Sequence, residues 1–536
     1  MNNDFQVKHG RATTLEDARK FQGSKYVQSA IEYTFKQIKS ELPQRRILFI
    51  GTPCQVAGLI NYIPTKLQTN LTTISFICGG VPSIKFLKQN LTPFLNDAQS
   101  LKFRNGEKYG FPSNILMQGY YWEEMTDINQ DTPRYLWNGC YSAIAAANQA
   151  LQAIEELGDP EEAQPYKGEA LMCRAYGHFA LAKIFCMAYG DDADTNLGIP
   201  YITAPETNVG VQYERGTLAE TYAMIDKDIE EGLPLISSEA YDIPLYHFNQ
   251  NAAYAFAAQF NLFYNKFDKA IRYATEAIGE DPSSVLRNMG GYAQFPSSME
   301  YTLAYISSDE PANLMLQQTM SWWGSNYKSA YRYGHSREIC EKQTIWSKGP
   351  YGSLKVYETV LGYGDQSIFV PKMDQFKEIA NAITGSYYGR QVAFAFTTDK
   401  TLLNRAEAYV LSKQYDKAVN DLQYWYRIKA ATKVPDKDEL NLFYETVDPT
   451  TNGKPLDPKF ALEAGLQTNL LKAVIHARRI ETVHEGERWQ DIKRFGIEIS
   501  HNIENESPIV LKAHDLRKAV QIPASVVEAG MQPNPR

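Results

Sequence analysis

The sequence has few cysteines, no surplus of basic residues and no long apolar run. Its 536 residues include six cysteines, too few to suggest a small disulfide-stabilised domain. No apolar run reaches the roughly 18 residues that a membrane-spanning helix requires. The formal net charge of −8 gives no general attraction to nucleic acid. The length allows about three domain-sized units with a large core.

Aromatic side chains are abundant and make up 12% of the residues. Residues 1–105 carry 14 basic and 6 acidic side chains, three tyrosines and no tryptophan. Residues 106–536 carry 40 basic and 56 acidic side chains, 32 tyrosines and all seven tryptophans. Such an asymmetry predicts two domains with these bounds, although ordinary variation between domains explains the composition equally well.

The first ten residues, MNNDFQVKHG, are polar throughout. A signal peptide has a basic start, about 7–15 apolar residues and a small-residue cleavage site, and none of these is present here. The first cysteine, Cys54, is too far along the chain to be the lipid-bearing end of a lipoprotein. The chain as written therefore begins as a cytoplasmic protein would.

The first hundred residues predict a small α/β unit. A helix is expected within 24–39, and short apolar strands at 47–50 and 72–78 give a βαβ-like pattern. Cys54 and Cys78 both follow strands, where α/β folds place their functional sites. Small core residues are the simpler interpretation of both cysteines.

Three segments of this unit, GSKYVQSAI, LFIGTPCQVAGL and ISFICGGVPS, resemble the beta-subunit family of deazaflavin-coenzyme hydrogenases and dehydrogenases. The resemblance covers about residues 20–110 and implies flavin and iron–sulfur chemistry, with Cys54 and Cys78 as the cofactor positions. The sequence lacks the ferredoxin-like CxxCxxCxxxCP run, and Cys78-Gly79-Gly80 stands where the family has Cys-His-Gly. The expectation is a vestigial fragment and no bound cofactor.

The later part of the chain predicts a mainly α-helical fold. Helices are expected at 137–157 and 166–189, and Thr217 and Glu220 have the spacing of a capping box that begins another helix. Residues 253–278 and 401–426 form an internal repeat of the tetratricopeptide type. Long irregular segments are expected between these helices, and such segments are usually functional. They are residues 190–215, 280–400 and 430–465.

Residues from about 110 to 536 resemble the SusD/RagB family. The resemblance is carried in order by WNGCYSAIAAANQAL, KGEALMCRAYGHFALAKIFCMAYG, YHFNQNAAYAFAAQFNLF, LLNRAEAYV, ARRIETVHEGERWQDIKRFG and VQIPASVVEAGMQPNPR. It implies a non-catalytic, lipid-anchored protein at the surface of Bacteroidetes-type bacteria. Such a protein binds glycans or other nutrients and covers a TonB-dependent, SusC-like outer-membrane barrel. The family's signal peptide and lipid-bearing cysteine have no counterpart in this sequence.

Candidate ligand-binding residues are aromatics in loop-like stretches, because a flat ring with a polar edge suits the face of a sugar. The candidates are Trp322, Trp323 and Tyr327, with Tyr120 and Trp122 beside Tyr121 in a second stretch. The alternative role for these rings is structural: their faces would pack against the edge of the hydrophobic core. Three further tryptophans lie on helical patterns and are expected in the core. They are Trp137, Trp425 and Trp489.

Several polar clusters have simpler interpretations than a functional site. The acidic turn at 192–198 alternates like calcium ligands but lacks the bidentate glutamate of an EF-hand, so a solvated turn is expected. His484 has no second histidine at zinc-motif spacing. Helical spacing predicts a structural ion-pair face at Glu481, Glu485, Arg488 and Asp491. No nucleophile–base motif is apparent.

The preferred interpretation is non-catalytic binding of an oligosaccharide at the cell surface, with delivery to an outer-membrane transporter and no role in nucleic-acid binding. One alternative is a cytoplasmic flavin and iron–sulfur oxidoreductase with a helical-repeat appendage. Another is a helical-repeat scaffold that binds a protein. A stoichiometric absorbance band would favour the first alternative, and a failure to bind any glycan would favour the second.

Overall fold

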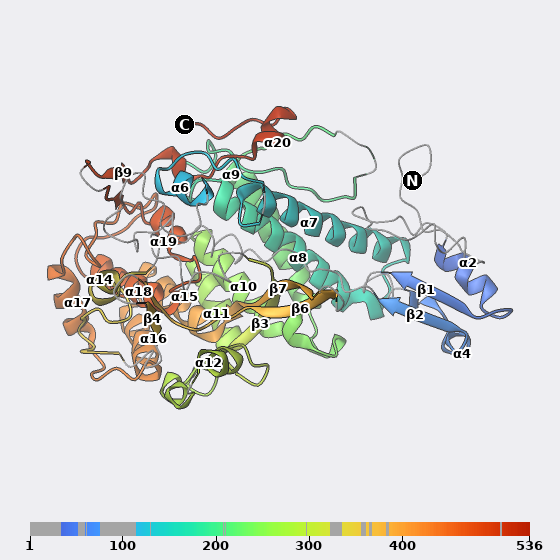
Figure 1. The fold of residues 1–536 in the computed structure, drawn as a ribbon, viewed down its shortest axis with the longest axis horizontal. Coiled ribbons are helices and arrows are strands. Elements are labelled where there is room, and N and C mark those ends of the chain that lie inside the picture. Colours follow the sequence, from blue (N-terminus) through green and yellow to red (C-terminus); the bar gives the residue numbers. More distant parts are fainter. Residues whose placement is uncertain are drawn as a thin grey trace. The chain divides into compact units, whose positions relative to one another are not determined.

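The computed structural model describes most of the chain (Figure 1). The described residues are 34–51, 59, 60, 62–75, 114–128, 130–206, 208, 211–295, 297–321, 335–354, 361–363, 367–381, 385–503 and 506–536. The chain divides into two compact units, Met1–Gly80 and Val81–Arg536. Each unit is considered by itself.

The first unit contains a short parallel strand pair. Its elements are α2 (Thr34–Glu41), β1 (Ile47–Gly51), α4 (Thr65–Gln68) and β2 (Leu71–Ser75). Ile47 lies opposite Leu71 in the parallel ladder, in agreement with the expected βαβ-like pattern. A small core forms where α2 packs beside the strands, and Leu42 and Leu59 are fully buried in it. Cys54 and Cys78 lie outside the described residues.

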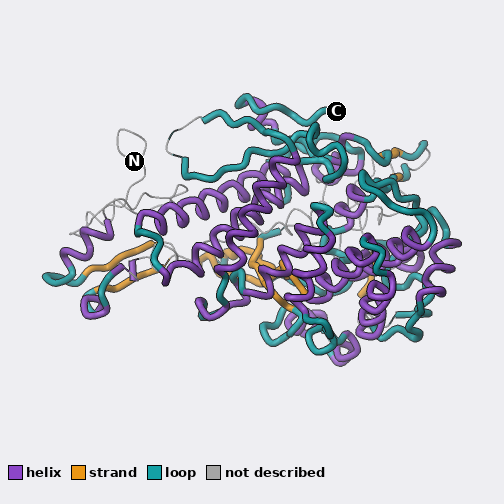
Figure 2. The backbone as a smooth tube through the Cα atoms, turned by 180° about the vertical axis from the view of Figure 1, so that it is seen from behind, coloured by secondary structure: helices purple, strands orange, loops and turns teal. Residues whose placement is uncertain are grey.

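The second unit is mainly α-helical, as expected, and its helices are drawn in purple in Figure 2. Its first helices are α6 (Asn114–Tyr120), α7 (Pro133–Glu156), α8 (Gln164–Phe185) and α9 (Leu218–Gly232). Thr217 and Glu220 form the predicted capping box of α9, in which each side chain accepts the other residue's backbone N–H. Helices α7, α8 and α9 pack in sequence against one another.

The predicted repeat is present as two helix pairs, α10 (Gln250–Phe263) with α11 (Phe267–Ile278) and α15 (Thr398–Leu411) with α16 (Tyr415–Ile428). Although a long segment separates the pairs in sequence, α11 packs directly on α15. The Arg405 side chain of α15 donates two 2.8 Å hydrogen bonds to Asp421 of α16. It also donates to the Gly279 carbonyl at the end of α11, at 2.7 Å, and so ties three helices together.

Residues 280–400 are more regular than the sequence predicts. They contain a three-stranded antiparallel sheet in the order β3 (Asn313–Thr319), β7 (Ser386–Thr397) and β6 (Phe376–Asn381). Two short strands, β4 (Leu361–Tyr363) and β5 (Ser367–Phe369), pair with each other and precede β6 in the sequence. Two helices also lie in this region, α12 (Ser298–Tyr305) and α14 (Arg337–Gln343). The expectation of one long irregular segment is therefore wrong.

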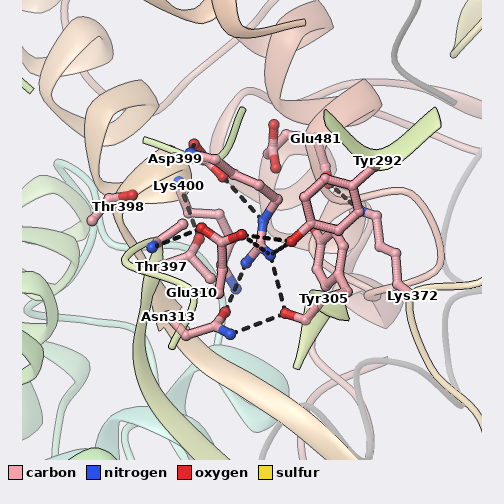
Figure 3. A network of polar contacts seen from close by, with 12 residues as sticks. Tyr292, Tyr305, Glu310, Asn313, Lys372, Thr397, Thr398, Asp399, Lys400 and Glu481 are labelled. Carbon is pink, nitrogen blue, oxygen red and sulfur yellow. Dashed lines mark hydrogen bonds and ion pairs between the residues drawn. The ribbon is translucent and has the colours of Figure 1, made fainter. Parts of the chain in front are cut away.

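A buried polar network joins this sheet to the helical repeat (Figure 3). Arg287 is fully buried and donates to the Tyr292 hydroxyl at 2.8 Å and to the Tyr305 carbonyl at 3.0 Å. It also donates to Asn313 Oδ1, at the start of β3, at 2.7 Å. Its Nε lies 3.6 Å from Asp399 Oδ2 in the first turn of α15. Because buried charges need partners, this network fixes the base of the sheet.

The last helices do not continue through the predicted ion-pair face. Helix α18 (Leu466–Glu481) ends before His484 and Gly486, which have φ of 68° and 74°, and α19 (Arg488–Arg494) begins after them. The four predicted residues therefore do not share one helix face, because the left-handed positions break the helix. All four side chains are buried and interact with residues of other elements. Glu481, for example, forms an ion pair with Lys429 at 2.7 Å.

The remaining elements complete the C-terminal part. They are α17 (Lys437–Thr446), β8 (Ile499–His501), β9 (Ile509–Leu511) and α20 (Ala524–Glu528). Helix α17 packs on α18, so the predicted irregular segment 430–465 also contains a helix. Among the described residues, no helix is both long and apolar enough to cross a membrane.

Candidate functional site

The long strand β7 has two different halves. Residues 391–397 pair with β3 and are mostly buried, whereas residues 386–390 pair with β6 and are largely exposed. The outer half of β7 and its partner β6 form a hairpin, here called the β6–β7 hairpin (residues 376–381 and 386–390). It extends past the last β3 pair, which joins Thr319 to Gln391.

The β6–β7 hairpin carries large apolar side chains that are open to solvent. The exposed fractions are 71% for Ile379, 46% for Tyr387 and 54% for Tyr388. Ile379 lies directly opposite Tyr387, so these two side chains share one face of the hairpin. Because successive strand residues point to opposite faces, Tyr388 lies on the other face, opposite Glu378. Both faces therefore present a tyrosine ring.

Each tyrosine has a cationic neighbour. The Lys377 ammonium lies 4.6 Å from the centre of the Tyr387 ring, and the Arg390 guanidinium lies 5.4 Å from that of Tyr388. Arg390 also forms an ion pair with Glu378, its neighbour on the same face. These contacts restrict the rings and place hydrogen-bonding groups beside them. Such an arrangement can pack against C–H groups and hydrogen-bond to hydroxyls.

The loop tryptophans predicted as ligand-binding residues, Trp322 and Trp323, lie outside the described residues, as does Tyr327. The described chain before them ends at Ser321. The Ser321 amide donates to Gln391 Oε1 at 2.9 Å, at the point where the two halves of β7 meet. The chain thus enters the predicted aromatic segment beside the base of the β6–β7 hairpin.

The second predicted stretch lies in the core. Tyr120 and Trp122 are both buried, and each ring stacks on His501, with centroids 4.4 and 4.3 Å apart. The Tyr120 hydroxyl also donates to the Asn502 carbonyl at 2.7 Å. Their ring faces therefore pack against protein in this structure, which is the alternative role that the sequence left open. Tyr121 beside them is half-buried.

The tryptophans predicted as core residues are confirmed. Trp137, Trp425 and Trp489 are all buried. The Trp425 indole donates to Glu481 Oε2 at 2.8 Å, so its polar edge is satisfied. In the acidic turn, Asp192 lies 3.7 Å from Lys459, and its backbone carbonyl accepts from Thr195. Within the described ranges, no three His, Cys, Asp or Glu side chains are grouped to hold a metal ion.

Sequence reasoning missed Tyr387 and Tyr388. The signal was available in the pattern of residues 386–397, SYYGRQVAFAFT, whose polar start and alternating apolar end are typical of a strand with one exposed half. Treating 280–400 as one irregular segment concealed that pattern.

Comparisons with known proteins support the helical architecture. The model of a SusD-like family, described as starch-binding and associating with the outer membrane, matches residues 90–262. The chain is 27% identical over 165 residues to SusD-like protein P38 of Formosa agariphila. That match covers 30% of this chain and 29% of the relative, so it spans less than a third of the relative's length.

Solved structures extend the likeness over most of the chain. A SusD superfamily protein of Bacteroides fragilis has a TM-score of 0.58 at 19% identity, over 85% of this chain and 93% of its own. A SusD-like carbohydrate binding protein of Bacteroides vulgatus has a TM-score of 0.55 at 17% identity, over 83% of this chain and 95% of its own. The chain has a SusD-like fold, and its residues 90–262 are similar in sequence to the SusD-like family.

Proposed function

We propose that this protein is a non-catalytic glycan-binding protein of the bacterial cell surface, and that the β6–β7 hairpin forms part of its binding site. The observation that carries the proposal is the pair of exposed rings, Tyr387 and Tyr388, each beside a cation on a hairpin with a rigid base. Exposed aromatic side chains with adjacent polar groups suit the apolar face and hydroxyl rim of a sugar.

The proposed setting is the outer membrane, with a TonB-dependent, SusC-like barrel as the partner that receives the glycan. The SusD-like fold and the match over residues 90–262 support this setting. The earlier candidates Trp322 and Trp323 are proposed as further contacts, because the chain leads into them from Ser321 beside the hairpin base.

Affinity electrophoresis of the full chain tests the proposal. The protein would be run through gels that contain starch, other plant glycans or host glycans. We expect at least one glycan to retard the protein, and the double variant Tyr387→Ala/Tyr388→Ala to remove most of the retardation. The matched control is Tyr246→Ala, which removes an exposed tyrosine that lies outside the hairpin.

The same experiment distinguishes the alternatives. If no glycan retards the protein, glycan binding is contradicted and a protein-binding scaffold is favoured. If the double variant is retarded to the same extent as the wild type and the Tyr246→Ala control, the hairpin is not the site. A stoichiometric flavin or iron–sulfur absorbance band in the purified protein would instead favour the oxidoreductase alternative.

A further inference from the structure

A polar pocket lies between α18, the start of α19 and the loop that follows α17. About 280 Å³ of empty space lies in and in front of it, and because part of that space is open solvent, the interior suits a small oxyanion group and not a whole sugar residue. Lys472, His476 and Arg479 line it from α18, at spacings of four and three residues that place them on one helix face. Lys454 from the loop and Arg488 from α19 complete the charged lining.

The charged side chains that line this pocket all have one sign. Four basic residues contribute to it, whereas none of the described residues lining it is acidic. Asn452 and Thr451 add neutral hydrogen-bonding groups. A converging set of ammonium and guanidinium groups with amide and hydroxyl neighbours is the usual recognition chemistry for carboxylate, sulfate and phosphate oxygens.

The pocket wall at His476 is rigid. The Nδ1 atom of His476 lies 2.8 Å from the Tyr444 hydroxyl, and its Nε2 lies 2.8 Å from Ser347 Oγ and 3.0 Å from Asn452 Nδ2. Burial, with Arg479 and Arg488 nearby, lowers the pKa of His476 to about 3. The imidazole is therefore neutral at physiological pH and contributes shape instead of charge.

Two neutral amides orient the Arg479 guanidinium. It donates to Gln343 Oε1 at 2.6 Å and to Asn452 Oδ1 at 3.4 Å. Arg488 lies 3.9 Å from Asp491 Oδ2, and the Lys454 ammonium donates to the Glu498 carbonyl at 3.2 Å. These contacts fix the directions of the cationic groups, as a preorganised binding site requires.

Lys472 differs from the other cations of the pocket. It is half-buried, and it makes no hydrogen bond or ion pair with any other residue in the described part of the chain. Burial lowers the pKa of Lys472, and no neighbouring carboxylate opposes that effect. A half-buried ammonium is costly without a partner, so an anion from outside the chain would offset the cost.

We propose that this pocket is a binding site for a carboxylate or sulfate group, with Lys472 as the side chain that contacts it directly. The site is separate from the β6–β7 hairpin, so the proposal goes beyond the glycan-binding function and does not depend on it. The anion is either free in solution or carried by an acidic saccharide, and the shared chemistry is the oxyanion.

Isothermal titration calorimetry on the full chain tests this site with three probes: sodium sulfate, glucuronate and, as a neutral comparison, glucose. Ionic strength would be held constant with sodium chloride. We expect an oxyanion to bind and Lys472→Gln to weaken that binding at least tenfold, which corresponds to about 1.4 kcal/mol. Glucuronate binding more tightly than sulfate would identify a saccharide as the source, and equal affinities would identify the free anion.

Two control variants separate a specific contact from general electrostatics. Lys227→Gln removes the same charge from an exposed site on α9, and Lys167→Gln removes it from a partly exposed site in the first turn of α8. We expect both to bind within twofold of the wild type. The proposal is overturned if neither anion binds up to about 50 mM, far above a millimolar dissociation constant. It is also overturned if Lys472→Gln, folded as judged by thermal unfolding, binds like the wild type.

Discussion

Lys377 and Tyr387 are diagonal neighbours on one face of the β6–β7 hairpin, with the ammonium 4.6 Å from the ring centre. The contact restrains an exposed ring without burying it. A restrained ring loses less conformational freedom when a ligand packs on it, so more of the contact energy contributes to binding. In the proposed glycan site, the pair holds the Tyr387 ring in place before a ligand packs on it, with little effect expected on folding.

Substitutions at Tyr387 should separate ring packing from hydrogen bonding. Tyr387→Phe keeps the ring, and we expect it to retain most of the affinity for the best glycan. Tyr387→Ala should lose about 1 kcal/mol of binding free energy, roughly fivefold in affinity. The half-exposed side chain leaves the free energy of unfolding within about 0.5 kcal/mol of the wild type. Calorimetry and urea unfolding measure the two quantities. Equal affinities of the Phe and Ala variants would argue against ring packing.

Trp322→Ala and Trp323→Ala test the proposed contribution of the tryptophan pair. We expect each variant to weaken glycan retention in affinity gels, because an aromatic plate is removed from the segment that follows Ser321. The matched control is Trp346→Ala, which removes an exposed tryptophan after α14. Retention unchanged in both tryptophan variants would leave the hairpin as the site and remove these two residues from it.

The buried ion pair Arg405–Asp421 should stabilise the fold only while both partners are present. Asp421→Ala leaves a buried guanidinium without its main partner, and we expect the free energy of unfolding to fall by about 3–5 kcal/mol. Replacing both residues, with Arg405→Met/Asp421→Leu, should cost less because no buried charge remains. Glu463→Ala breaks the exposed pair with Lys413 and should cost about 0–1 kcal/mol. Urea unfolding measures all three. A double variant less stable than Asp421→Ala would refute the explanation.

His178 should make stability depend on pH. Burial lowers its pKa from 6.5 to about 3, and its Nε2 accepts the Ile202 amide hydrogen at 3.0 Å, which requires the neutral ring. Below pH 6.5 the unfolded chain gains a proton at this residue that the folded chain does not, so stability is lost as pH falls from 6.5 towards 3. The loss reaches about 1.4 kcal/mol per pH unit.

The variant His178→Phe isolates this effect because it cannot titrate. At pH 7.5 it should be less stable than the wild type, since the Ile202 amide loses its acceptor. The difference should narrow as the pH is lowered from 6.5 to 5. Urea unfolding at pH 7.5, 6.0 and 5.0 gives the comparison, and a difference that stays constant across this range would contradict the expected titration.

The features predicted correctly from the sequence are local ones. The helix pairs follow from apolar spacing and matching repeats within about 30 residues of chain, and the capping box of α9 needs only Thr217 and Glu220. The sheet was not predictable in this way, because Leu316 of β3 pairs with Phe394 of β7. Pairing over such a separation leaves little trace in a local pattern.

The candidate site shows the same limit. An aromatic residue in a loop-like stretch suggests a ligand, but Tyr120 and Trp122 are buried on His501, which lies far along the chain. Conversely, the exposure of Tyr387 and Tyr388 depends on β3 ending at Thr319, which no property of the two tyrosines reveals. Local sequence identified the residue types suited to a sugar, and the tertiary contacts decided which of them face solvent.

The division of β7 has an evolutionary consequence. Its inner half pairs with β3, whose Asn313 accepts a hydrogen bond from the buried Arg287, so changes there reduce stability. Its outer half pairs with β6, and about half of the Tyr387 and Tyr388 side chains is exposed, so these two residues can be exchanged at low cost to folding. Substitutions in the inner half of β7 thus reduce stability, whereas substitutions in its outer half change it little. Ligand preference can therefore diverge through the outer half while the scaffold stays the same.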